Sequence, residues 1–240
     1  MQVLMISIGA IIIVSILINK SPTALLTGLG ASAAVLMLIF KDSILGFVAG
    51  VQLSQNKMIQ IGDWIQMPDG SANGTVEEIT LNTVKIRNWD NTITTLPPYT
   101  LISSAFRNWR GMQESGGRRV DKMIHLDVTT IDVCTPDMVD QIVRRIPLMS
   151  DFKCETESVT NSQLYREYIV RYLRHHDCVT QNLDLIIAQR EGGQFGIPIE
   201  VYFFLKEKRW EQFEKIQSDI FDHFIAMAPE FGLKLYQLPT

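Results

Sequence analysis

Two long apolar runs occupy the start of the chain. Residues 3–18 are apolar apart from two serines, and residues 23–40 are nearly as apolar. Each run approaches the roughly 20 residues that a helix needs to cross a bilayer. A polar segment at residues 19–22 separates them and predicts a tight turn. The pattern therefore predicts a membrane helical hairpin whose first spanning helix covers residues 1–19.

A cleaved signal peptide is the alternative interpretation of the first run. The run lacks a basic start and a small-residue cleavage site, and a second apolar run follows it, so the hairpin is favoured. Basic residues lie overwhelmingly after residue 56, with one, Lys20, in the turn. Because basic residues accumulate on the cytoplasmic side, we expect both chain ends in the cytoplasm and the turn outside it.

The second run differs from the first because it carries a cluster of small residues. Such residues mark surfaces where helix backbones approach closely in a bilayer. From this feature alone, a simple helix dimer and a ring of several helices are equally compatible with the sequence. The cluster consists of Gly28, Gly30, Ala31, Ser32, Ala33 and Ala34.

Residues 40–43, with Lys41 and Asp42 among them, interrupt the second run, and an amphipathic segment resumes at residues 44–53. We expect a kinked helix over residues 23–55 with its break at the interruption. The resumed segment has a bulky apolar face and a small-residue face, each at helical spacing, which suits packing against identical neighbours in a closed ring. The small-residue face consists of Gly46, Ala49, Gly50 and Leu53.

Short alternating segments punctuated by turn residues follow, over residues 58–101. They predict four strands, at residues 64–67, 74–79, 83–87 and 92–96. We expect a small, Sm-like β-barrel domain over residues 56–108.

The remaining residues, 109–240, alternate strand and helix patterns after a glycine-rich linker. Thr135 and Pro136 predict a helix start, because threonine caps helices and proline favours the first helical turn. Strands are expected at 122–128, 183–189, 197–205 and 233–238, with helices at 139–146 and 210–224. This order is that of an α+β ferredoxin-like domain. Residues 147–181, with a helix at 164–174, are interpreted as an insertion.

Composition excludes several functions. The net charge of −4 and the pI near 5.6 give no basic field for nucleic acid, so no nucleic-acid partner is expected. Cys134, Cys154 and Cys178 are widely spaced, which favours free thiols in a reducing compartment over a disulfide framework or a zinc site.

The sequence contains no catalytic or metal-binding motif. There is no GxSxG, Walker or GxGxxG pattern, and the four histidines form no metal-ligand spacing. His175 and His176 are interpreted as a solvated pair at a helix end. We therefore expect no enzyme activity, no metal and no cofactor.

Two stretches together resemble the family of small-conductance mechanosensitive channels, the MscS family. One is the glycine- and alanine-rich helix with its interruption, and the other is IGDWI at residues 61–65 followed by GTVEEI at 74–79. The second stretch contains the barrel-motif residues Gly62, Asp63 and Gly74. The resemblance runs from about residue 23 to the end. It is closest to the miniconductance (YbdG-like) branch, through the segment 40–46 and the insertion.

The resemblance implies a bacterial inner-membrane channel subunit that membrane tension opens to release ions and small solutes during hypoosmotic shock. It implies a homoheptamer whose pore is lined by the second helix, with membrane lipids and permeating ions as further partners. Pore-lining positions would be Ala31, Ala34, Leu38, Lys41 and Asp42. A ring of Leu38 would form a dewetted barrier, and rings of the two charged residues would bias ion selectivity. Mutual neutralisation of those charges at the interface is an equal alternative.

Departures from the family pattern concern the pore. Lys41 and Asp42 stand where the family has a helix-breaking glycine, Ala34 stands at the upper leucine ring, and Leu38 matches the lower ring. A membrane-tethered oligomeric scaffold and a membrane-anchored RNA-binding barrel remain the alternatives to a channel. The abrupt start in a spanning helix is compatible with further helices upstream.

Overall fold

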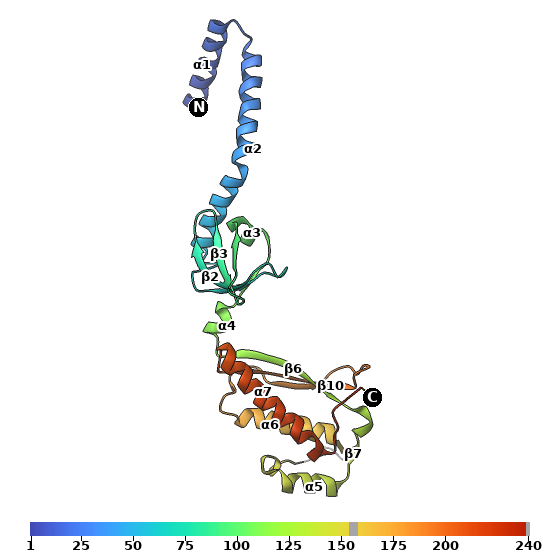
Figure 1. Cartoon of the computed structure of the whole chain (residues 1–240). Helices are drawn as coiled ribbons and strands as arrows, with labels where there is room; N and C mark the ends of the chain where they lie inside the picture. Colours follow the sequence, from blue (N-terminus) through green and yellow to red (C-terminus); the bar gives the residue numbers. More distant parts are fainter. Residues whose placement is uncertain (154–157, 239–240) are drawn as a thin grey trace. The chain divides into compact units, whose positions relative to one another are not determined.

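The computed structural model describes residues 1–153 and 158–238, and only the backbone of Leu4. The chain forms two compact units that divide after Arg110 (Figure 1). Cys134 is buried and Cys178 is partly exposed, whereas the third predicted thiol, Cys154, lies outside the described residues.

Two helices begin the first unit. α1 (Gln2–Ile18) ends at Asn19, whose left-handed conformation, with φ of 53°, lets its N–H close the last turn on Ile16. α2 (Pro22–Gln55) begins at Ser21, whose side chain accepts a hydrogen bond from the backbone N–H of Ala24. Among the described residues, α2 is the helix long and apolar enough to cross a membrane, while the apolar helix Met5–Ile18 is shorter.

α2 is one uninterrupted helix of 34 residues. Helical structure therefore continues through residues 40–43, and the kink expected there stays a prediction. Lys41 and Asp42 interrupt the apolar pattern, but neither residue removes a backbone donor or forces a left-handed conformation, so the helical hydrogen bonds continue. The pattern marks a change in the helix surface and leaves the backbone helical.

An antiparallel five-stranded sheet follows in the same unit, in the order β4-β3-β2-β1-β5. The strands are β1 (Trp64–Gln66), β2 (Asn73–Ile79), β3 (Val84–Asn88), β4 (Ile93–Leu96) and β5 (Arg107–Asn108). The first four confirm the strands expected from the turn residues, while β5 and the helix α3 (Pro98–Ser103) were not predicted. Leu53 of α2 joins the buried core of this β domain with Ile65 and Ile86, so the end of the helix belongs to the domain.

The second unit is built on a three-stranded antiparallel sheet, in the order β6-β10-β9. Its strands are β6 (Arg118–Leu126), β9 (Ile186–Gln189) and β10 (Ile197–Leu205), and the short helix α4 (Arg110–Glu114) precedes them. Alternate residues of β10 are buried. Two helices, α6 (Asn161–His175) and α7 (Trp210–Met227), lie on one side of the sheet in Figure 1 and share its core.

The outer part of this unit differs from the expected arrangement. α5 (Pro136–Arg145) starts as predicted, with Thr135 accepting from Met138 N–H, but it buries one residue, Ile142. α6, placed within the expected insertion, buries seven residues and is a core helix. The short strands β7 (Val133–Cys134) and β8 (Val159–Thr160) pair beside α5.

The last expected strand, residues 233–238, is present as one antiparallel bridge between Leu235 and Leu126 and not as a strand. Three short 3₁₀ turns, η1 (Val128–Thr130), η2 (Pro147–Met149) and η3 (Ala228–Phe231), complete the described elements. The Sm-like barrel, the ferredoxin-like topology and the insertion at about 147–181 stay predictions.

Candidate functional site

We call residues 22–43 of α2 its upper part and residues 44–55 its lower part. The surface of the upper part is not covered by the rest of the chain. The predicted pore positions Ala31, Ala34, Leu38, Lys41 and Asp42 are all exposed within the chain, and Leu38 is 73% exposed. Leu38 belongs to a run of exposed apolar side chains from Val35 to Phe40, and a contiguous surface of this kind marks contact with lipid or another protein.

The expected helix-packing glycines in this part are uncovered as well. Nothing within 4 Å would meet a methyl group added at Gly28 or Gly30. Within the chain, the helix therefore leaves room for close approach by something other than itself.

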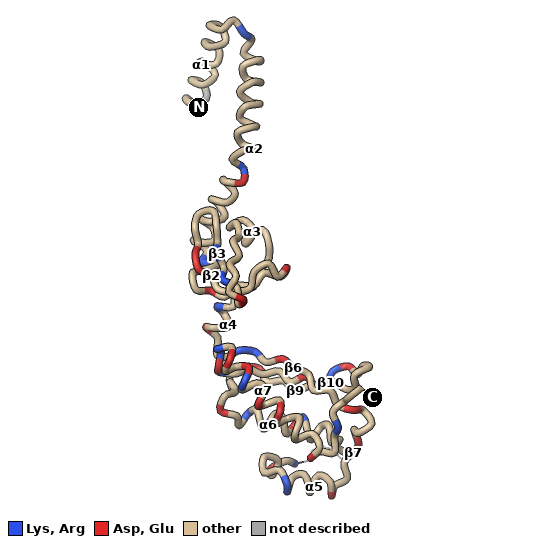
Figure 2. The backbone as a smooth tube through the Cα atoms, viewed as in Figure 1, with Lys and Arg blue, Asp and Glu red and all other residues tan. Residues whose placement is uncertain are grey.

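Charged residues are sparse along α1 and the upper part of α2, and frequent in the rest of the chain (Figure 2). Lys41 and Asp42 line an open hollow of about 560 Å³ together with Asn82 and Tyr99 of the β domain. The first charged positions of α2 therefore lie where the helix reaches the β domain.

The lower part of α2 is docked on the β domain of the same chain. Gly46, Ala49, Gly50 and Leu53 are buried. A methyl group on Gly50 would lie 2.9 Å from the backbone oxygen of Leu81, in the turn between β2 and β3. The sequence pattern placed this small face against a neighbouring subunit, and it did not identify the chain's own β domain as a partner.

The bulky face of the same segment has no such cover. Ile44, Phe47 and Val48 are 54%, 51% and 44% exposed. One face of the lower helix is therefore held by the chain, and the other is available.

The three barrel-motif residues have distinct physical roles. Gly62 has a φ of 93°, a conformation that residues with a side chain rarely adopt, and it starts the turn into β1. Gly74 lies against β3, where a methyl group would be 1.9 Å from the backbone oxygen of Arg87. Asp63 is buried and charged, and it organises a polar cluster.

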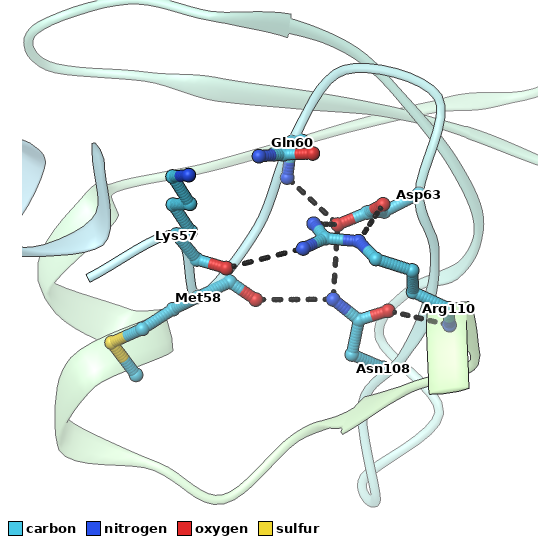
Figure 3. Close-up of polar contacts among 6 residues, drawn as sticks. All are labelled: Lys57, Met58, Gln60, Asp63, Asn108 and Arg110. Atoms are coloured by element: carbon cyan, nitrogen blue, oxygen red, sulfur yellow. Dashed lines mark hydrogen bonds and ion pairs between the residues drawn. The ribbon is translucent and has the colours of Figure 1, made fainter. Parts of the chain in front are cut away.

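Figure 3 shows this cluster, in which side chains from the end of the β domain reach back to the exit of α2. Asp63 accepts a hydrogen bond from Gln60 N–H at 2.7 Å and from Asn108 Nδ2 at 3.0 Å, and forms a two-pronged ion pair with Arg110. Arg110 also donates to the backbone oxygen of Lys57. We call these residues, together with Met58, the exit cluster.

Electrostatics keep Asp63 ionised. Burial opposes the charged form, but hydrogen bonds from Arg110, Asn108 and the Gln60 backbone outweigh it and lower the pKa of Asp63 below its ordinary value. Sequence reasoning singled out Asp63 but missed Asn108 and Arg110, which lie 45 and 47 residues further along. No local spacing connects positions so far apart.

Three tryptophans border the cluster and were also missed. The rings of Trp64 and Trp109 stack with centroids 4.6 Å apart, and Trp89 meets Trp64 edge-on at 5.4 Å. Asn73 Oδ1 accepts hydrogen bonds from the indole N–H groups of Trp64 and Trp89. These contacts fix the ends of β1 and β5 together.

Among the described residues, no group of three or more His, Cys, Asp or Glu side chains could hold a metal ion. His175 and His176 end α6, as the sequence predicted. His223 of α7 lies with its Nε2 2.5 Å from the hydroxyl of Tyr168 and stacks on Tyr172. Burial and then the nearby His176 lower the pKa of His223.

Comparison with known proteins relates the chain to one group. The family model described as mechanosensitive ion channel, beta-domain, matches residues 42–111. The small-conductance mechanosensitive channel MscMJ of Methanocaldococcus jannaschii is 38% identical over 86 residues, which cover 36% of this chain and 24% of that protein. The low conductance mechanosensitive channel YnaI of Escherichia coli is 25% identical over 214 residues, covering 89% of this chain and 53% of YnaI.

Solved structures share the fold. The crystal structure of Helicobacter pylori MscS in its closed state covers 99% of this chain and 80% of that chain, with a TM-score of 0.60 and 15% identity. The structure of Arabidopsis thaliana MSL1 covers 90% of this chain and 66% of that chain, with a TM-score of 0.65 and 16% identity.

The chain spans between 24% and 53% of the length of these two curated relatives. Its β domain, the long apolar helix before it and the fold of the whole described chain all match members of one group. The family model at residues 42–111 and a relative that spans 89% of the chain make this chain similar to mechanosensitive channels, and the solved structures share its fold.

Proposed function

We propose that this chain is a subunit of a mechanosensitive ion channel, opened by membrane tension to release ions and small solutes during hypoosmotic shock. The observation that carries the proposal is α2 itself. Its uncovered apolar upper part continues without a break into a segment docked on a β domain of the mechanosensitive-channel type.

The proposal includes a topology in a bacterial inner membrane, with α1 and α2 as spans and both larger domains in the cytoplasm. α1 has 17 residues and is about 26 Å long, slightly less than a hydrocarbon core of about 30 Å. Local thinning of the bilayer accommodates such a span at modest cost. The sparse charge of both helices supports this arrangement.

Assembly into a homoheptamer is part of the proposal, because a single helix cannot enclose a pore. The uncovered glycines Gly28 and Gly30 and the exposed bulky face at Phe47 are surfaces that identical copies would cover. In this assembly α2 lines the axis, and lipids cover the outer helix surfaces. We assign the chain to the miniconductance (YbdG-like) branch on the segment 40–46.

Leu38 is the proposed constriction. A ring of leucine side chains narrows a pore and excludes water, which blocks ions without a physical plug. Ala31 and Ala34 lie on the same helical face above it, and Lys41 and Asp42 lie at the cytoplasmic mouth. Tension favours whichever state occupies more membrane area, so a wider pore gains population as tension increases.

The test is patch-clamp recording of the purified protein in liposomes while suction is increased. The expected result is unitary currents that require tension and that change when Leu38 is replaced. If protein shown to be an assembled ring gives no current up to membrane rupture, the channel function is wrong and the membrane-tethered scaffold is favoured.

A further inference from the structure

The exit cluster joins three segments that are distant in the sequence. Lys57, Met58 and Gln60 follow the end of α2, Asp63 precedes β1, and Asn108 and Arg110 end the β domain. Arg110 is the last residue of the first unit and Gly111 the first of the second. The cluster is therefore where the chain enters the β domain and where it leaves.

The contacts capture backbone oxygens of the segment that directly follows α2. The backbone oxygen of Met58 accepts from Asn108 Nδ2 at 3.0 Å, and that of Lys57 accepts from Arg110 Nη1 at 3.3 Å. Asn108 Oδ1 in turn accepts from the backbone N–H of Arg110 at 2.9 Å. Both Asn108 and Arg110 therefore hold the segment that follows α2, and Asn108 also holds the backbone of Arg110.

Backbone contacts with β1 and the stacking of Trp109 on Trp64 also hold the end of the β domain. β5 has two residues, paired with Ile65 and Gln66 of β1, and the Trp109 N–H donates to the Trp64 oxygen. The ion pair itself is nearly shielded, with the Asp63 side chain 8% and the Arg110 side chain 24% exposed. A shielded two-pronged pair is stronger and more directional than a surface pair.

We propose that Asp63 and Arg110 are positioning residues for gating, which tie the exit of α2 to the end of the β domain and thereby set the tension at which the channel opens. The inference rests on the proposed function, and it identifies residues that set the membrane tension at which the channel opens. Load applied to α2 passes into the β domain through the docked face of the helix and through residues 56–63, and the ion pair stiffens the second path. Loosening it lets α2 move at lower tension, while the pore and its conductance are unchanged.

The decisive variant is Arg110→Lys in the full chain, recorded in liposomes. Lysine keeps the charge beside Asp63, so no buried carboxylate is left alone, but one ammonium cannot serve both carboxylate oxygens and the Lys57 oxygen. Glu77→Gln is the matched control, because it removes an exposed ion pair with Arg87 on β2 and β3 of the same domain.

The expected result for Arg110→Lys is a lower midpoint tension. At a tension where the wild type is open one tenth of the time, we expect the ratio of open to closed channels to increase about fivefold or more, the low end of coupling between sites. Unitary conductance should stay at the wild-type value, and Glu77→Gln should match the wild type in both quantities. A purely structural pair would instead lower the melting temperature of the assembly and leave the midpoint unchanged.

Asn108→Ala is the second variant, and it decides the question if Arg110→Lys does not assemble. It removes the Asn108 hydrogen bonds with Met58, Asp63 and the Arg110 N–H and leaves the ion pair in place, so a smaller shift in the same direction is expected. Midpoints equal to that of Glu77→Gln in a conducting channel would overturn the inference while leaving the proposed function intact. A wild type that never conducts would overturn both.

Discussion

Replacing Gly50 by alanine tests whether the lower part of α2 and the β domain form one packed body. The added methyl group would lie 2.9 Å from the backbone oxygen of Leu81 and 3.7 Å from its carbonyl carbon. An ordinary contact needs about half an ångström more, and a backbone atom cannot rotate away as a side chain can. The helix or the β2–β3 turn must therefore shift.

Two opposing energies set the size of the effect. Overpacking of this kind costs about 1–3 kcal/mol, and replacing a helical glycine by alanine gains about 1 kcal/mol. The net destabilisation is up to about 2 kcal/mol, or a factor of about 30 in the folding equilibrium. Gly46→Ala is the matched control, because its methyl group would meet the Asn82 side-chain oxygen at 3.8 Å, an ordinary contact. That variant should gain up to about 1 kcal/mol.

The assay is thermal unfolding of both variants in the same detergent. One turn of helix separates the two glycines, yet the changes in stability should have opposite signs. Equal stabilities for Gly50→Ala and Gly46→Ala would refute the docking of α2 on the turn. Recordings under tension add a second test. If the contact between Gly50 and Leu81 is present in both the closed and the open state, the added methyl group destabilises both states equally. The tension at half-maximal opening would then be the same for Gly50→Ala and Gly46→Ala.

Three further predictions concern other parts of the chain. Leu38→Ser should hydrate the proposed barrier, slow the growth of cells that express it and lower the tension needed for current, whereas wild-type conductance and growth would reject Leu38 as the constriction. Gly74→Ala should prevent folding of the β domain, because the clash with the Arg87 backbone exceeds the usual overpacking cost of about 1–3 kcal/mol; monodisperse protein on size exclusion would contradict this. Stability should fall as pH drops below about 6.5, because unfolding releases His223 to its ordinary, higher pKa. His223→Gln should reduce the loss of melting temperature between pH 7.5 and 5.5, and an unchanged loss would exclude this histidine as the titrating group.

Local patterns predicted most of the elements of the β domain. Turn residues such as Asn91, whose φ is 65°, bound strands β1 to β4 to within two residues of their observed ends. The helix starts at Thr135 and Ser21 follow from capping chemistry, although only the first was predicted. These features depend on residues that are close in the sequence.

Features that depend on distant residues could not be predicted in the same way. The partner of Asp63 is 47 residues away, and the partner of the Gly50 face is the turn at Leu81. α6 was predicted as a helix, but its place in the core is not visible in its own pattern. The last strand was expected from its alternation, but it is present as one bridge at Leu235, flanked by backbone hydrogen bonds from Tyr236 N–H to His125 and from Asp127 N–H to Lys234.

Under the proposed function, the length of α2 limits the motion that opens the pore. A helix of 34 residues is about 51 Å long, and a hydrocarbon core takes about 30 Å, so about 20 Å must lie outside it. Counted from Pro22, about 20 residues reach Lys41, the first charged residue of the helix and the last position before the helix approaches the β domain. The helix is unbroken there, so tension on the upper part reaches the docked part through an intact backbone. Tilting of an intact α2 about its docked end, and not unwinding at Lys41, is therefore the opening motion that this arrangement favours.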